Sequence, residues 1–173
     1  MRCHRGRTPV PLFSLEELVE AATVVRTFVA PTPIYAWPLL EQRTGVKVFV
    51  KHENHTPTGA FKSRGGLVNL DALRRDGQLP KGLVTATRGN HGQSIAVAAT
   101  RQGTPSVVVV PEGNSQEKNA AMRAFGAELV IAGADFDESR EVAARIARER
   151  DYIWCRRFIP RWSRASLRMR TSC

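Results

Sequence analysis

The chain has 173 residues, 42% of them hydrophobic, and a formal net charge of +10, which suits a single globular domain. No apolar run approaches the roughly 18 residues that cross a bilayer, so we expect no membrane partner. The three cysteines, Cys3, Cys155 and Cys173, fit neither a zinc site nor a disulfide framework, so we expect a cytoplasmic protein without a metal ion.

The positive charge is concentrated at the end of the chain. Six arginines follow Cys155 with no acidic residue among them, and without these six the net charge falls from +10 to +4. They are Arg156, Arg157, Arg161, Arg164, Arg168 and Arg170. A charge confined to a tail is not the basic face of a nucleic-acid-binding domain, so we expect no nucleic-acid partner.

Strand and helix patterns alternate along the chain. The first predicted helix runs from Ser14 to Thr27, because Ser14 and Glu17 form a capping-box pattern. Prolines between residues 31 and 38 then indicate extended connections. The later elements are, in order, a strand Val46–Lys51, a helix Phe61–Arg75, a strand Leu83–Ala86, a helix His91–Arg101, a strand Ser106–Val110, a helix Ser115–Phe125, a strand Glu128–Ile131 and a helix Asp135–Arg150. Repeated β-α-β units predict an α/β fold, a parallel sheet with helices on both faces.

Residues 52–66 read HENHTPTGAFKSRGG and place Lys62 after a short strand and a tight turn, at the start of a helix. A lysine at such a junction is held near a ligand, and burial favours the neutral amine that forms a Schiff base with an aldehyde. The alternative is an ordinary surface lysine in a loop. The contexts of the other lysines are those of strand edges, loops or solvated helix faces: Lys47, Lys51, Lys81 and Lys118.

The segment around Lys62 resembles a known motif. Glu53-Asn54, residues 57–62 and Arg64-Gly65 are similar to the cofactor-lysine motif of the pyridoxal-phosphate enzymes related to the tryptophan synthase β-subunit. Within that superfamily the segment is most similar to the threonine and serine dehydratases. The resemblance implies that Lys62 carries pyridoxal 5'-phosphate and that Phe61 also binds this cofactor.

A second motif follows along the chain. Residues 83–87 form an apolar run, residues 88–92 a glycine-bounded turn, and a helix-forming segment comes next. The N–H groups at the start of that helix suit an anion such as a carboxylate. In the resembled dehydratases the matching loop holds the substrate carboxylate, and its asparagine touches the ring hydroxyl of the cofactor. The resemblance therefore implies cofactor contact for Asn90 and a carboxylate loop that consists of Arg88, Gly89, Asn90, His91 and Gly92.

Arg88 distinguishes two reactions of the resembled superfamily. Related racemases have a serine two positions before the asparagine, where it serves the second face of the substrate carbon. This chain has Arg88 at that position. We therefore favour a dehydratase with one base over a racemase.

The resemblance implies the N-terminal portion of the tryptophan synthase β-like, fold type II architecture. Residues 14–81 would be the first segment of a large domain and residues 82–153 a small α/β domain, with the active site in the cleft between them. Family chains continue with a glycine-rich loop for the cofactor phosphate and a serine or threonine at the pyridine nitrogen, and this sequence matches neither. Full-length relatives are expected to be homo-oligomers. Residues 1–13 are expected to be a non-native leader.

We expect the tail over residues 154–173 to be out of frame. Trp154 has a single codon that ends in G, and every Cys155 codon begins with TG, so the frame one base earlier gives valine. Continued through permitted codons, that frame spells a strand end and an amphipathic helix that resemble the dehydratase continuation. The alternative is a native arginine-rich tail that binds acidic partners.

The resemblance implies β-elimination from threonine or serine, a small amino-acid substrate, to a 2-oxo acid and ammonia. This chain would be a truncated and inactive copy. Lys62 would carry the cofactor and move the Cα proton, because its amine already lies beside that carbon. Two alternatives remain: a β-replacing relative such as a cysteine or threonine synthase, and a non-catalytic α/β fragment with a basic tail.

The frame hypothesis makes a prediction about the gene. The coding DNA should contain the shifted frame, open past the codon for Cys173 for about another 100–150 residues, the usual size of a domain. Sequencing the gene beyond its stop codon tests this. Early stop codons in that frame would support the native basic tail instead.

Overall fold

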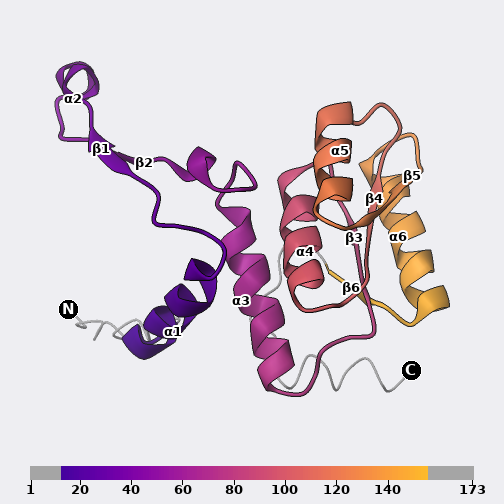
Figure 1. Cartoon of the computed structure of the whole chain (residues 1–173). Helices are drawn as coiled ribbons and strands as arrows, with labels where there is room; N and C mark the ends of the chain where they lie inside the picture. Colours follow the sequence, from indigo (N-terminus) through magenta and orange to yellow (C-terminus); the bar gives the residue numbers. More distant parts are fainter. Residues whose placement is uncertain (1–12, 156–173) are drawn as a thin grey trace, which may run out of the picture.

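The structure, a computed structural model, describes residues 13–155 of the chain (Figure 1). Of the expected leader only Phe13 is described, and of the expected tail only Trp154 and Cys155; their other residues lie outside the described residues. No helix within 13–155 is long and apolar enough to cross a membrane. The elements follow in this order: α1 Leu15–Arg26, β1 Ile34–Ala36, α2 Pro38–Thr44, β2 Phe49–Lys51, the 3₁₀ turn η1 Glu53–His55, α3 Lys62–Arg75, β3 Leu83–Ala86, α4 Asn90–Arg101, β4 Ser106–Val110, α5 Gln116–Ala124, β5 Glu128–Ile131, α6 Phe136–Arg150 and β6 Ile153–Trp154.

Four parallel strands form the main sheet, in the order β5-β4-β3-β6. Strands β3 and β4 are buried along their whole length, which is typical of parallel strands covered by helices on both faces. The short strand β6 joins the sheet beside β3. There the Cys155 N–H donates to the Val84 carbonyl at 2.7 Å, and Thr85 Oγ1 donates to the Cys155 carbonyl at 2.9 Å.

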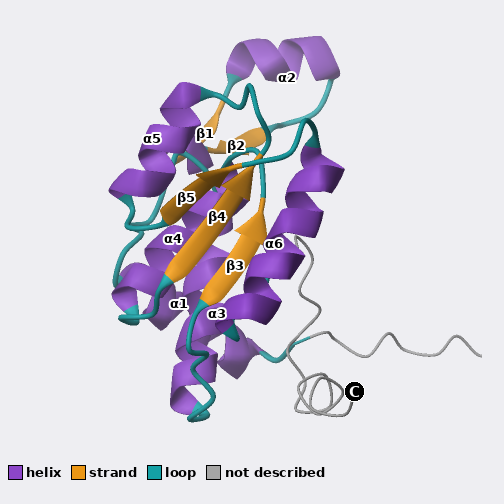
Figure 2. Ribbon diagram, turned by 90° about the vertical axis from the view of Figure 1, so that its right-hand side faces the viewer, coloured by secondary structure: helices purple, strands orange, loops and turns teal. Residues whose placement is uncertain are grey.

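Alternate residues of β3 and β4 point to opposite faces of the sheet. Val84 and Val107 pack against α6 on one face. Leu83 packs against α4, and Val108 packs against both α4 and α5, on the other face. Figures 1 and 2 show the sheet between these two helical layers. The predicted α/β fold with helices on both faces is confirmed.

Most of the predicted elements are confirmed to within one residue at each end. This holds for α1 and for every element from α3 to α6. The capping box is also present, since Ser14 Oγ accepts the Glu17 N–H at 3.2 Å and Glu17 Oε2 accepts the Ser14 N–H at 2.7 Å. Local signals therefore determine these elements well.

The segment between α1 and α3 differs from the prediction. The strand expected over Val46–Lys51 is shorter and pairs antiparallel with the unpredicted β1, in a separate two-stranded sheet. Pro38 does not lie in an extended connection but begins α2, because its missing N–H and fixed φ suit a first helical position. Figure 1 shows α2, β1 and β2 set apart from the main sheet. Several of their apolar side chains are exposed, among them Trp37, Leu39 and Phe49.

Helix α3 packs against α4 at close range. Ser94 Oγ on α4 donates a hydrogen bond to the Lys62 carbonyl on α3 at 2.7 Å. Gly66 faces the same serine: a Cβ there would overlap Ser94 Oγ and lie 2.8 Å from the Ser94 carbonyl oxygen. This contact therefore sets the separation between the beginnings of the two helices.

The close contact predicts opposite effects at two adjacent glycines of α3. Gly66→Ala should lower the free energy of unfolding by about 1–3 kcal/mol, because the added methyl meets backbone atoms that cannot move aside. Gly65→Ala is the matched control, since a Cβ there meets nothing within 4 Å. It should raise stability by about 0.5–1 kcal/mol through helix propensity. Urea unfolding of both variants tests this, and equal effects would contradict it.

Candidate active site

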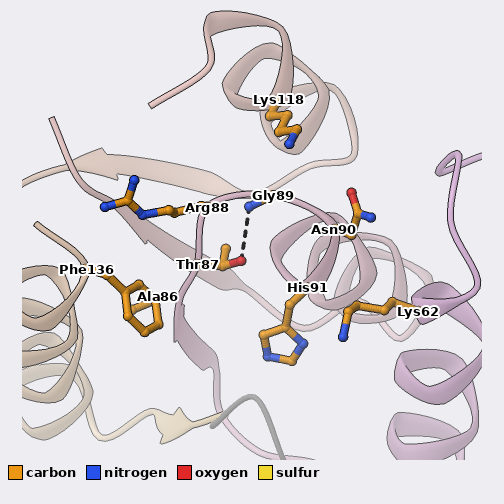
Figure 3. Close-up of a pocket in the computed structure, with 9 residues that line it drawn as sticks. All are labelled: Lys62, Ala86, Thr87, Arg88, Gly89, Asn90, His91, Lys118 and Phe136. Atoms are coloured by element: carbon orange, nitrogen blue, oxygen red, sulfur yellow. Dashed lines mark hydrogen bonds between the residues drawn. The ribbon is translucent and has the colours of Figure 1, made fainter. Parts of the chain in front are cut away.

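The main sheet places a cavity at the carboxyl end of β3. Strands β3, β4 and β5 follow one another in one direction, and the chain then returns through α6 to put β6 on the other side of β3. Such a reversal of strand order is where ligands bind in open α/β sheets. The cavity has a volume of about 420 Å³ and is lined by the nine residues drawn in Figure 3.

A tight turn before α3 fixes the backbone of the expected cofactor lysine. Thr56 Oγ1 accepts the Ala60 N–H and donates to the Ala60 carbonyl, both at 2.9 Å, and Thr58 Oγ1 donates to that carbonyl at 3.1 Å. Gly59 has a φ of 63°, in the left-handed region that glycine adopts without steric cost. Both threonines are buried. Lys62 therefore begins α3 from a well-anchored backbone.

An ion pair joins the first turn of α3 to η1. Arg64 donates to both carboxylate oxygens of Glu53, from Nε at 2.7 Å and from Nη2 at 3.0 Å. Thr32 Oγ1 donates to Glu53 at 2.6 Å, and Lys51 Nζ lies 3.6 Å from Glu53 Oε1. The hydrogen bonds from Arg64 lower the pKa of Glu53 to about 2, although desolvation opposes the shift. Arg64 follows Lys62 by two residues in the first turn of α3. This network therefore also restrains the backbone of Lys62.

The amine of Lys62 reaches the cavity from the start of α3 (Figure 3). Its Nζ lies 5.6 Å from the centroid of the Phe61 ring. Phe61 itself is 61% exposed and is not part of the cavity lining. The structure therefore places Phe61 beside the lysine but outside the cavity.

The loop between β3 and α4 supplies the opposite wall. Thr87 is buried, and its Oγ1 accepts the Gly89 N–H at 3.1 Å. Asn90 begins α4, and the first N–H groups of a helix have no intrahelical acceptors and carry partial positive charge. Arg88, Gly89, Asn90 and His91 all line the cavity. Four of the five expected loop residues thus share one cavity with Lys62.

Gly92 is the loop residue that does not line the cavity. It is buried beneath the loop, where a Cβ would lie 2.5 Å from Met122 Sδ and 2.6 Å from Thr87 Cγ2. A side chain at this position would push the loop away from the sheet. Gly92 therefore supports the loop by close packing and does not itself line the cavity.

The sequence analysis missed the other residues that line the cavity. Ala86 and Thr87 directly precede the predicted loop, so the end of the predicted strand could have indicated them. Lys118 is exposed, as expected for a solvated helix face, yet its stem lies over the loop: a Cβ on Gly89 would be 2.9 Å from Lys118 Cδ. Lys118 and Phe136 come from α5 and α6, and no local pattern marks either residue.

The chemistry of the cavity fits the pyridoxal phosphate that the motif resemblance implies. Lys62 offers a primary amine to an aldehyde, and Asn90 offers an amide to a ring substituent. Arg88, Lys118 and the start of α4 suit anionic groups. The volume lies within the roughly 300–1,000 Å³ of small-molecule sites. Among residues 13–155, no cluster of three or more His, Cys, Asp or Glu side chains could hold a metal ion.

Comparison with known proteins agrees with the fit of the cavity to pyridoxal phosphate. The protein-family model described as "Pyridoxal-phosphate dependent enzyme" matches residues 25–164. The L-threonine ammonia-lyase of Geobacter sulfurreducens is 38% identical over 117 residues, which are 68% of this chain and 29% of that protein.

Solved structures resemble the fold at comparable identity. The processed form of threonine deaminase isoform 2 from Solanum lycopersicum has 30% identity and a TM-score of 0.72 over 83% of this chain and 42% of its own. A pyridoxal 5'-phosphate-dependent aspartate racemase has 32% identity and a TM-score of 0.74, over 84% of this chain and 46% of its own. The chain thus spans less than half the length of these relatives.

The lowered pKa of Glu53 predicts a pH-dependent stability. The ionised Glu53 stabilises the folded chain fully above about pH 4.5, and this contribution is lost as the pH falls toward the folded-state pKa of about 2. Glu53→Gln, which resembles the protonated acid, should cost about 1.5–3 kcal/mol at pH 7.

The difference between the parent and Glu53→Gln should shrink steadily in urea unfolding between pH 5 and pH 3. Glu141→Gln, which removes an exposed carboxylate of α6, is the control and should leave the stability of the parent nearly unchanged. A constant difference across this pH range would show that Glu53 acts without its charge.

Proposed function

Because the chain belongs to the pyridoxal-phosphate-dependent enzyme family, we propose that it carries the cofactor lysine and the substrate loop of an ammonia-lyase acting on threonine, serine or a similar β-hydroxy amino acid. The observation that carries this proposal is the single cavity shared by Lys62 and the start of α4. One wall offers an amine nucleophile and the other an anion-binding helix start. An amino-acid substrate would require both walls, because the amine would act at its Cα and the helix start would bind its carboxylate.

The comparisons support an ammonia-lyase more than any other member of the family. The relatives with substantial identity include proteins named threonine ammonia-lyase and threonine dehydratase. Racemases share the fold at similar TM-scores, so the fold alone does not choose between the reactions. Arg88 favours the lyase, because it stands where related racemases have the serine that serves the second face of the substrate carbon.

The residues of the cavity have separate binding roles in this proposal. Lys62 Nζ would hold the cofactor covalently, and the Asn90 amide would orient its ring. The first turn of α4, with Gly89 and His91, would bind the substrate carboxylate through N–H groups and partial positive charge. The Glu53–Arg64 pair and the Thr56 turn would hold the backbone of Lys62 in place, and so keep its amine near that carboxylate.

The proposed elimination requires one residue that accepts the Cα proton of the substrate. When bound, pyridoxal phosphate supplies a conjugated ring that spreads the negative charge left on Cα. Lys62 Nζ would accept the Cα proton, because it enters the cavity from the start of α3, whereas Lys118, the other lysine among the described lining residues, lies on α5 above Gly89. The β-hydroxyl would leave as water with the proton that Lys62 took from Cα, and hydrolysis of the resulting enamine would give a 2-oxo acid and ammonia. The water released is the water consumed, so the reaction is balanced.

Lys62→Ala tests the proposal directly. The protein is incubated with pyridoxal phosphate and reduced with borohydride, and the labelled lysine is identified by peptide mass spectrometry. The parent should be labelled at Lys62, and the variant should lose this label and any release of 2-oxo acid from threonine or serine. Alanine preserves the first turn of α3 because it is the best helix former.

Two further variants sharpen the test. Lys81→Ala removes an exposed lysine of a loop and should be labelled like the parent. Asn90→Ala should keep the label and slow any turnover by about 10²-fold, because it orients the ring without anchoring it. Equal labelling of Lys81 and Lys62 in the parent, or any release of 2-oxo acid by Lys62→Ala, would refute the assignment. Sulfide-dependent consumption of serine in place of ammonia release would favour the β-replacing alternative.

A further inference from the structure

One end of the cavity is apolar. Among the described residues that line the cavity, only Ala86 and Phe136 have side chains made of carbon alone. Figure 3 shows these two residues together, on the side of the cavity opposite to Lys62. The proposed reaction so far gives this end of the cavity no role.

Phe136 is half-buried between the protein core and the cavity. It packs against the core cluster that includes Val84, Ala86 and Val107. The part of the side chain that the core leaves uncovered lines the cavity. An aromatic ring that is already packed on the core loses little freedom when a ligand covers the rest of it.

Hydrogen bonds at the start of α6 fix the backbone of Phe136. Asp135 Oδ1 accepts the N–H groups of Asp137 and Glu138, both at 2.9 Å. Ser139 is fully buried, and its Oγ donates to the Asp135 carbonyl at 2.8 Å. The ring therefore reaches the cavity from a rigid helix start, as a wall that selects between similar ligands must do.

The substituents of the substrate Cα leave one direction for the side chain. In the proposed function the amino group joins the cofactor at Lys62, the Cα hydrogen faces the same lysine, and the carboxylate binds at the start of α4. Arg88 and Lys118, which also line the cavity, suit anionic groups. The side chain is thus left with the end formed by Ala86 and Phe136, where contact removes apolar ligand surface from water.

We infer that Phe136 determines which side chains the substrate can have, and that it selects β-hydroxy amino acids with an alkyl group on Cβ. The ring makes contact with a methyl or longer alkyl group, and it offers neither a hydrogen bond nor a charge to a polar group. Serine, which has no carbon atom beyond Cβ, would leave the ring uncovered. The inference rests on the proposed function, because it names the side chain of the substrate in the same cavity.

Amino acids without a β-hydroxyl test this contact without turnover, because they carry no group that can leave. L-Alanine, L-2-aminobutyrate and L-norvaline differ by one methylene at each step. Ligand-observed NMR titrations of the cofactor-free protein compare their dissociation constants. Affinity should rise about fourfold with each added methylene, the effect of burying that methylene against the ring. L-Aspartate, whose side chain is charged, should bind more weakly than L-norvaline.

Two variants of Phe136 separate apolar contact from a loss of structure. Phe136→Gln makes the side chain polar and should remove most of the rise in affinity along the series. Phe136→Leu keeps the side chain apolar and should retain the rise. Phe49→Ala removes an exposed phenylalanine of β2 outside the cavity, and this matched control should also retain the rise.

Several outcomes would overturn the inference. A flat series in the parent, or an undiminished rise in Phe136→Gln, would show that the ring does not contact the side chain. Tighter binding of L-aspartate than of L-norvaline would assign this end of the cavity to a charged group. A loss of the rise in Phe136→Leu or Phe49→Ala as large as in Phe136→Gln would indicate a general change of structure.

Release of 2-oxo acid in the presence of cofactor provides a second readout. The ratio of kcat/KM for threonine to that for serine should be about 10 or more in the parent, the usual discrimination from one methyl group, and should fall toward one in Phe136→Gln. Release from both substrates with an unchanged ratio would overturn the role of Phe136 and leave the lyase standing. Absent labelling of Lys62 with an intact rise in affinity would refute the lyase and leave the apolar contact standing.

Discussion

The close contact between Gly66 and Ser94 is the constraint on which the site depends. Helix α4 is fixed by the buried face of the main sheet, and α3 touches that sheet mainly through α4. The position of Lys62 relative to the β3–α4 loop is therefore set where the two helices meet. A methyl group at Gly66 would move the Lys62 amine away from the start of α4 without touching either. The geometry of the cavity is thus a property of helix packing.

Residues before and after Lys62 in the sequence hold its backbone in place. Before it, buried threonines satisfy the turn that ends at Ala60. After it, Arg64 is held by a bidentate bond to a carboxylate that stays ionised in acid. A side chain with four rotatable bonds loses less freedom on binding when its backbone is already fixed. The motif around Lys62 therefore fixes the backbone of this lysine in addition to supplying its amine.

The sequence predicted the parts of the structure that local patterns determine. The capping box predicted the start of α1 and the apolar run predicted β3, and the motif residues from Arg88 to His91 line one cavity with Lys62. Lys118 and Phe136 could not be predicted, because only the stacking of α5 and α6 on the sheet brings them to the loop. The β1–β2 pair was missed for a similar reason: three-residue strands carry too little pattern, and Pro38 reads equally as a break and as a helix start.

The place of β6 in the sheet has a consequence for the order of folding. Pairing of β3 with β4 joins residues 83 and 106, whereas pairing of β3 with β6 joins residues 83 and 153. Closing the longer loop costs about 1 kcal/mol more chain entropy, and only two residue pairs offset it. We therefore expect strand β6 to dock last, onto a β3 whose other edge is already occupied. Until it docks, the Val84 carbonyl and the Thr85 hydroxyl would lack their partners at Cys155, and we expect the amides along this edge to exchange with solvent before those between β3 and β4.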